Sequence, residues 1–170
     1  MEVTNIDTFL DYYERIRERT KKLIAVVPPE QLEWAYLPGK FTIGDVIRHI
    51  ANIERYMYAE TVQGRPSAYQ GCDSSYAKGY ENTLAYFDTM HAESMAIFRN
   101  IGNEGLQRKC MTPAGIEIST GKWLRAMTEH EVHHRGELYI YLNLLGVKTP
   151  PIFTLTAEEV AARSISPGNS

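Results

Sequence analysis

The sequence TGKWLRAMTEHEVHHRGELYIYLNLLG, residues 120–146, predicts one long helix that packs against a core. Seven large side chains recur along it in steps of three or four residues, which is the spacing of a single helix face. They are Trp123, Met127, His130, His134, Leu138, Tyr141 and Leu145. Ser119 or Thr120 can cap the start of this helix, and Gly146 ends it. The two histidines therefore belong to the face that the helix buries.

Three other long segments show the same helical period. They cover residues 7–27, 42–62 and 79–101, and Gly or Pro follows each of them. Thr42 and Asp45 resemble a capping box at the start of the second segment. Residues 106–118, with a Pro-Ala-Gly turn at their centre, predict a short hairpin, and residues 157–163 a short helix. We therefore expect an all-α four-helix bundle with a hairpin before its last helix and a short C-terminal helix.

Size and charge limit the classes of protein to which the chain can belong. Its 170 residues fit a single domain, which we place at residues 1–165, followed by a frayed tail at 166–170. A net charge of −3 disfavours a nucleic-acid partner, because duplex binders usually carry a basic excess. No leader and no apolar run of membrane-spanning length is visible, and Cys72 and Cys110 form no disulfide framework. We expect a cytoplasmic protein that binds neither membranes nor nucleic acid.

The histidines are the residues most indicative of chemistry. His130 and His134 are four residues apart, so both rings leave one side of a helix and can hold the same metal ion. His49, flanked by Ile47 and Ile50 in the second helix, is a candidate third ligand. Two hydrogen-bonded core histidines would have the same spacing, so the pair alone leaves both readings open. His133 points about 100° away from His134 and is expected to face a neighbour or solvent.

Several charged groups are interpreted as surface or supporting residues. The run of alternating charges at residues 14–19 is expected to be a solvated helix face, and Glu54 with Arg55 a surface ion pair. Glu129, Glu131 and Glu137 surround the histidine motif. Each could orient an imidazole or be solvated, so no catalytic base is assigned and the catalytic residues remain unknown.

Two stretches together resemble the DinB-like (YfiT-related) metalloenzyme family. They are the His130–Leu142 segment HEVHHRGELYIYL, followed by Leu-Leu-Gly, and the second-helix segment TIGDVIRHI at residues 42–50. The resemblance implies an up-down-down-up bundle with a divalent metal, zinc or nickel, held by His49, His130 and His134. The family name refers to expression induced by DNA damage, a stress response, and does not imply DNA binding.

The resemblance also implies a class of reaction. Relatives in the wider superfamily include bacillithiol transferases and mycothiol-dependent enzymes, so transfer of a small-molecule thiol to an electrophilic substrate is the leading expectation. A bound cation lowers the pKa of a thiol or a water, so hydrolysis is the nearest alternative. A non-catalytic metal-binding bundle and a homodimer are left open. If the helices that carry His49 and His130 are antiparallel, Trp34, Tyr36 and residues 106–118 are expected to form the rim of the cleft.

Overall fold

Side-chain caps fix where two of the bundle helices begin in the computed structural model, which describes residues 3–164. Helix α1 (Ile6–Ile24) starts after Asn5, whose side chain accepts a hydrogen bond from the Thr8 amide. Helix α2 (Ile43–Ile53) starts with the expected capping box, in which Thr42 and Asp45 each bond the other's backbone amide. The short 3₁₀ turn η1 (Pro29–Gln31) lies between them.

The second bundle helix changes its winding halfway along. After α2 the chain forms the π-helical segment η2 (Glu54–Tyr58) and then α3 (Ala59–Thr61) without leaving the helical path. A π turn holds one residue more than an α turn. The inserted turn therefore changes which side chains after Ile53 face the other helices. The helical path ends before Gly64, close to the expected boundary.

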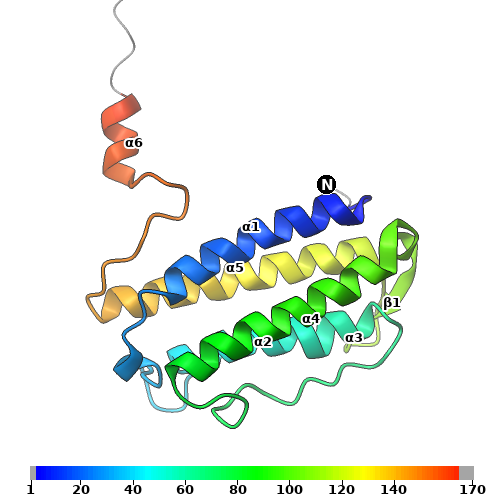
Figure 1. Cartoon of the computed structure of the whole chain (residues 1–170), viewed down its shortest axis with the longest axis horizontal. Helices are drawn as coiled ribbons and strands as arrows, with labels where there is room; N and C mark the ends of the chain where they lie inside the picture. Colours follow the sequence, from blue (N-terminus) through cyan, green and yellow to red (C-terminus); the bar gives the residue numbers. More distant parts are fainter. Residues whose placement is uncertain (1–2, 165–170) are drawn as a thin grey trace, which may run out of the picture.

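The remaining elements follow the sequence prediction. The helical path of α4 (Tyr80–Gln107) breaks at Gly102, as predicted, because this residue takes a φ of 62° that glycine alone adopts readily, and a further helical segment continues to Gln107. Strands β1 (Lys109–Met111) and β2 (Glu117–Ser119) form the predicted antiparallel hairpin, which leads into α5 (Thr120–Leu144). Helix α6 (Ala157–Ser164) stands away from the bundle and buries none of its residues (Figure 1). The tail expected at 166–170 lies outside the described residues.

The four long helices form an up-down-down-up bundle, as expected (Figure 1). Helices α1 and α2 each pack against both α4 and α5. The direction of each helix follows from paired contacts: Ile6–Asn103 and Lys21–Asp88, Asn52–Tyr86 and Arg55–Glu93, and His49–His130 and Thr61–Trp123. They make α1 antiparallel to α4, α2 parallel to α4, and α2 antiparallel to α5. None of the helices within residues 3–164 is long and apolar enough to cross a membrane.

A layer of buried charge separates two apolar cores. One core surrounds Ile47 and Leu138, and the other surrounds Phe98 and Leu124. Between them Arg17 is fully buried. It forms ion pairs with Glu54 of η2 and Glu131 of α5, and its guanidinium carbon lies 4.1 Å from the centre of the Phe87 ring of α4. Arg17 therefore contacts all four bundle helices.

His91 of α4 completes this layer. Its two ring nitrogens donate to Glu54 at 2.9 Å and to Glu14 at 3.1 Å. Burial is the largest effect and by itself would lower the pKa of His91, but the Glu54 and Glu14 carboxylates together outweigh it, so the net shift is upward. Burial likewise would raise the pKa of Glu54, whereas Arg17 and His91 bring it below its usual value.

The surface interpretation is therefore wrong for Arg17 and for Glu54, whereas Glu14, Arg15 and Glu18 are exposed, as expected. Arg17 lies four residues after the buried Tyr13, and Glu54 lies four residues after the buried Ile50, so both continue the inward stripe of their helix. Each charge is tolerated in the core because the other compensates it. Arg55 instead pairs with Glu60 and Glu93.

Substitution of Arg17 by Met should destabilise the protein severely. The change keeps the volume but leaves the buried Glu131 carboxylate without a cation and Glu54 with His91 alone, and breaking a buried pair in this way typically costs about 3–5 kcal/mol. Urea unfolding followed by circular dichroism measures the free energy of unfolding. The matched control is Arg125→Met, which removes an exposed i, i+4 pair with Glu129 and should cost no more than about 0.5 kcal/mol. Equal effects of the two substitutions would contradict the role given to Arg17.

Candidate metal centre

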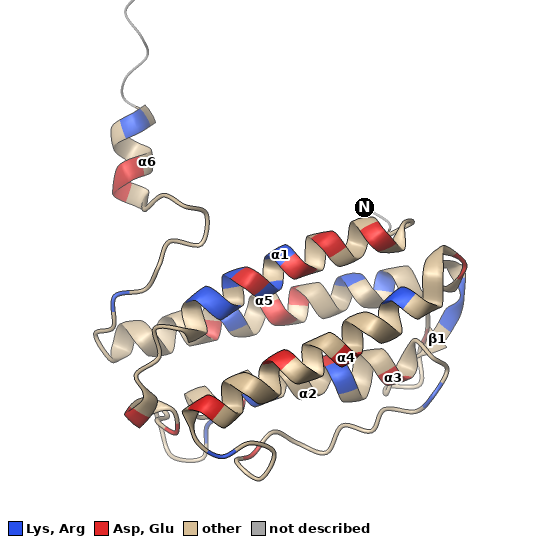
Figure 2. Ribbon diagram, in the orientation of Figure 1, with Lys and Arg blue, Asp and Glu red and all other residues tan. Residues whose placement is uncertain are grey.

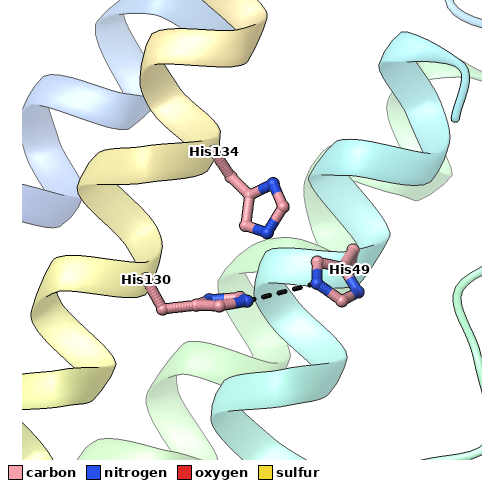
Figure 3. Close-up of side chains that lie close together, drawn as sticks. All are labelled: His49, His130 and His134. Atoms are coloured by element: carbon pink, nitrogen blue, oxygen red, sulfur yellow. Dashed lines mark hydrogen bonds between the residues drawn. The ribbon is translucent and has the colours of Figure 1, made fainter.

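Three imidazole rings converge between α2 and α5 (Figure 3). His49 comes from α2, and His130 and His134 lie one turn apart on α5. One nitrogen of each ring lies within 4.8 Å of the other two, and the Nε2 atoms of His49 and His130 are 3.2 Å apart. Within residues 3–164, no other three His, Cys, Asp or Glu side chains converge as closely. The structure thus brings together the three histidines that the sequence predicts.

The bundle positions these rings through helix phase and direction. His49 lies beside the buried stripe of Ile43, Ile47 and Ile50 and is half-buried at the edge of α2. Because α2 and α5 are antiparallel neighbours, this edge faces the i, i+4 pair on α5. All three rings are half-buried. Each therefore packs against the protein on one side and stays accessible to a bound molecule on the other.

A carboxylate holds His134 in one orientation. The Nδ1 atom of His134 donates a hydrogen bond to Glu137 Oε2 at 2.9 Å, and Glu137 Oε1 accepts one from the Tyr141 hydroxyl at 3.0 Å. A carboxylate can only accept, so the proton of the neutral ring lies on Nδ1 and the lone pair of Nε2 is free. The rings of Trp34 and Tyr36 pack edge-on against Tyr141. Of the three glutamates considered from sequence, Glu137 therefore has the orienting role.

A tyrosine from the long loop between α3 and α4 supports His49. The Tyr69 hydroxyl and His49 Nδ1 are hydrogen-bonded at 2.8 Å, and the Phe41 ring lies 5.3 Å from the His49 ring. The loop is held in place by the buried guanidinium of Arg48, which donates to the carbonyl oxygens of Cys72 and Ala77. The sequence carried no local signal for Tyr69, because its position depends on this clamp.

The surroundings keep the imidazoles neutral at physiological pH. Burial, with a smaller contribution from His134, lowers the pKa of His49 to about 4. Burial and the neighbouring imidazoles lower the pKa of His130 to about 3, and burial also lowers that of His134. Neutral rings offer the free lone pairs that a metal requires, so little proton release would accompany metal binding at neutral pH.

The donor set fits a borderline divalent cation. Zinc takes imidazole nitrogens at about 2.0–2.1 Å, which in a tetrahedron separates two of them by about 3.3 Å. The observed 3.2 Å between His49 and His130 is close to that value. Three neutral imidazole nitrogens suit zinc or nickel better than the oxygen-preferring magnesium or calcium, and on two of the rings the second nitrogen is hydrogen-bonded.

Other residues predicted to lie near the site are placed differently. His133 is exposed, as expected, and its ring lies edge-on to that of His134 without joining the cluster. Glu131 faces Arg17 and Thr20 in the core, and Glu129 is exposed. The hairpin at 106–118 lines a separate cleft with residues 64–67, so its expected place at the rim is wrong. Phe41 and Tyr69 occupy the rim instead, together with the predicted Tyr36.

Comparisons with known proteins agree on one family. A family model described as the DinB superfamily matches residues 12–138. A candidate metal-dependent hydrolase of Oceanobacillus iheyensis is 22% identical over 149 residues, covering 81% of this chain and 87% of that protein.

Two solved structures share the fold. YfiT of Bacillus subtilis, described as a probable metal-dependent hydrolase with an unusual four-helix bundle topology, superposes with a TM-score of 0.68 at 19% identity, covering 87% of this chain and 91% of that one. A mycothiol-dependent maleylpyruvate isomerase superposes with a TM-score of 0.65 at 12% identity, over 78% of this chain and 60% of the isomerase.

Substitution of any one of His49, His130 and His134 by alanine should abolish tight zinc binding, because each substitution removes one of the three candidate ligands. Isothermal titration of untagged protein with zinc measures the affinity. His133→Ala is the matched control, since it removes an imidazole next to the cluster that is not part of it. Loss of zinc binding in His133→Ala with retention in His134→Ala would reverse the assignment of ligands.

Substitution of Glu137 by Gln should weaken zinc binding about 10- to 100-fold, which is the usual effect of removing a partner that orients a ligating histidine. The same titration tests it. Glu129→Gln, a change of the same kind at an exposed position of α5, should leave the affinity unchanged. A smaller effect at Glu137 than at Glu129 would mean that the hydrogen bond to His134 does not support metal binding.

Proposed function

Because the chain belongs to the DinB superfamily, we propose that it is a metal-dependent enzyme and that the reaction it catalyses is hydrolysis. The hydrolase descriptions of the Oceanobacillus protein and of YfiT support this reaction class for their relative. The proposal depends on the site itself, since folds as widespread as a four-helix bundle host many chemistries.

One observation carries the proposal: the described residues supply three metal ligands and not four. Structural zinc sites are closed by four protein ligands, whereas catalytic sites keep a position for water or substrate. In residues 3–164 no fourth His, Cys, Asp or Glu side chain joins His49, His130 and His134. The half-buried rings leave that position within reach of a substrate.

The residues around the cluster have separable tasks. When bound, the cation would act as a Lewis acid that lowers the pKa of a water or thiol and polarises a carbonyl group. His49, His130 and His134 would hold it, while Glu137 and Tyr69 fix the orientation of two of these rings. Phe41 packs against the His49 ring, and Tyr36 packs against Tyr141, which bonds Glu137.

Thiol transfer is the second candidate, and the neutral donor set supports it as it supports hydrolysis. Three uncharged imidazoles leave the full positive charge of a divalent ion to act on whatever takes the open position, whether water or a small-molecule thiol such as bacillithiol. The fold shared with the mycothiol-dependent isomerase is compatible with this chemistry. Hydrolysis and thiol transfer are therefore best separated by measuring turnover.

The zinc- or nickel-loaded protein should hydrolyse simple carboxylic esters or amides, because the site can activate a nucleophile beside a bound carbonyl group. Release of nitrophenol from nitrophenyl esters measures this activity, which a chelator and His134→Ala should abolish. Glu129→Gln should retain it, since that exposed carboxylate is not part of the cluster.

The same preparations, given an epoxide or a halogenated compound with bacillithiol, mycothiol, glutathione, coenzyme A or cysteine, test the second candidate. Metal-dependent thiol consumption without ester or amide hydrolysis would replace hydrolysis by transfer. Neither activity in a protein that binds zinc tightly would indicate a non-catalytic metal-binding bundle.

A further inference from the structure

A cleft of about 610 Å³ opens on the outer side of α5 next to the histidine cluster. Its walls are mostly apolar and include the rings of Tyr36 and Tyr141 and the side chains of Ile140 and Leu144. Ile140 and Leu144 are 60% and 62% exposed, which is unusual for large aliphatic side chains that have no partner. The volume falls within the range of small-molecule sites.

The cleft owes its depth to a glycine inside a helix. Gly136 lies in the middle of α5, where glycine weakens a helix relative to alanine. It does not take a left-handed φ, and a Cβ placed on it would meet no atom within 4 Å. Neither the backbone nor the packing of the bundle therefore requires glycine here. Its effect is to leave the floor of the cleft open.

The cleft adjoins the metal centre through Glu137. This residue lines the cleft and also accepts the hydrogen bond from His134 Nδ1. His133 borders the cleft as well, and its ring lies edge-on to that of His134. A molecule seated in the cleft would thus lie against the carboxylate that orients His134 and against the His133 ring.

The charges around the cleft indicate which ligands it favours. No Lys or Arg lines it, and the single carboxylate, Glu137, is already engaged by His134 and Tyr141. The stretch of α5 beyond Glu137 carries no charged residue, as its tan ribbon shows (Figure 2). An anionic group would find no counter-charge here, whereas an uncharged apolar group would bury surface against four large side chains.

We propose that this cleft binds an uncharged apolar part of the substrate, an alkyl or aryl group, and that Gly136 sets how large that group can be. The proposal rests on the proposed function, since it places the reacting bond of the substrate at the histidine cluster. It commits the cleft to a small molecule rather than to a second copy of the chain, because the cleft adjoins His134 and its floor is open.

Binding of N-phenylnaphthylamine, an uncharged apolar dye that fluoresces on burial, tests the site in the full chain with and without zinc. The parent protein should bind the dye in both states, and neutral alkyl amides should displace it more effectively as their chains lengthen. Gly136→Leu fills the floor and should weaken dye binding by roughly tenfold. Its melting temperature should not fall, because leucine is the better helix former.

Asn143→Leu is the matched control. It adds the same side chain at an exposed position of α5 that does not line the cleft, and it should change dye binding less than twofold. Equal dye binding by the parent and Gly136→Leu would overturn the proposal. So would a parent dimer that Gly136→Leu dissociates without change in dye binding, since the cleft would then be an interface between copies.

The outcome does not depend on the proposed chemistry. Loss of zinc binding or of hydrolysis would contradict the proposed function while leaving the dye result for the cleft intact. If hydrolysis is observed, the ratio kcat/KM should rise with acyl chain length in the parent and lose that dependence in Gly136→Leu.

Discussion

A single buried guanidinium fixes the relative positions of the bundle helices. Arg17 of α1 pairs with Glu54 from the second bundle helix and Glu131 from the last one, and Glu54 in turn holds His91 of α4. Sliding any helix by one turn would separate buried charges from their partners, which costs far more than the loss of an exposed ion pair. Apolar side chains on either side can repack in several registers, but this layer has only one in which every charge is compensated. The charged layer therefore specifies the register of the helices rather than adding stability.

The histidine cluster depends on the same register. Glu131 follows His130 in α5, and Glu54 lies five residues beyond His49 in the second helix. The turns that supply the ion layer therefore also supply the metal ligands, with the charges facing the bundle axis and the imidazoles facing the groove between α2 and α5. Aligning Glu54 and Glu131 on Arg17 brings His49 opposite His130 and His134. A single alignment of the helices therefore positions both the ion layer and the metal centre.

Most of this architecture could be read from periodicity, and the parts that could not are tertiary in origin. The stripe through Met127, His130 and His134 predicts both the last helix and its two ligands, because phase is a local property. Arg17 and Glu54 look like surface charges until their partners are known, since a charge on an apolar stripe is stable only when another helix brings the opposite charge. The π-helical segment and the position of Tyr69 had no local signal. The first has no distinctive composition, and the second depends on Arg48, whose clamp on the loop appears only in the folded chain.

The long connection between α3 and α4 follows from the parallel direction of the second and third bundle helices. The chain must return along the whole bundle, about 28 Å for the 19 residues from Ile43 to Thr61, and on the way it passes the metal centre and delivers Tyr69 to His49. Surface loops accept changes of length at a small entropic cost, whereas the helices are tied by their buried charges. Evolution can therefore change the loop that covers the site without disturbing the helices that carry the histidines. Differences in substrate between relatives accumulate most easily in this one loop.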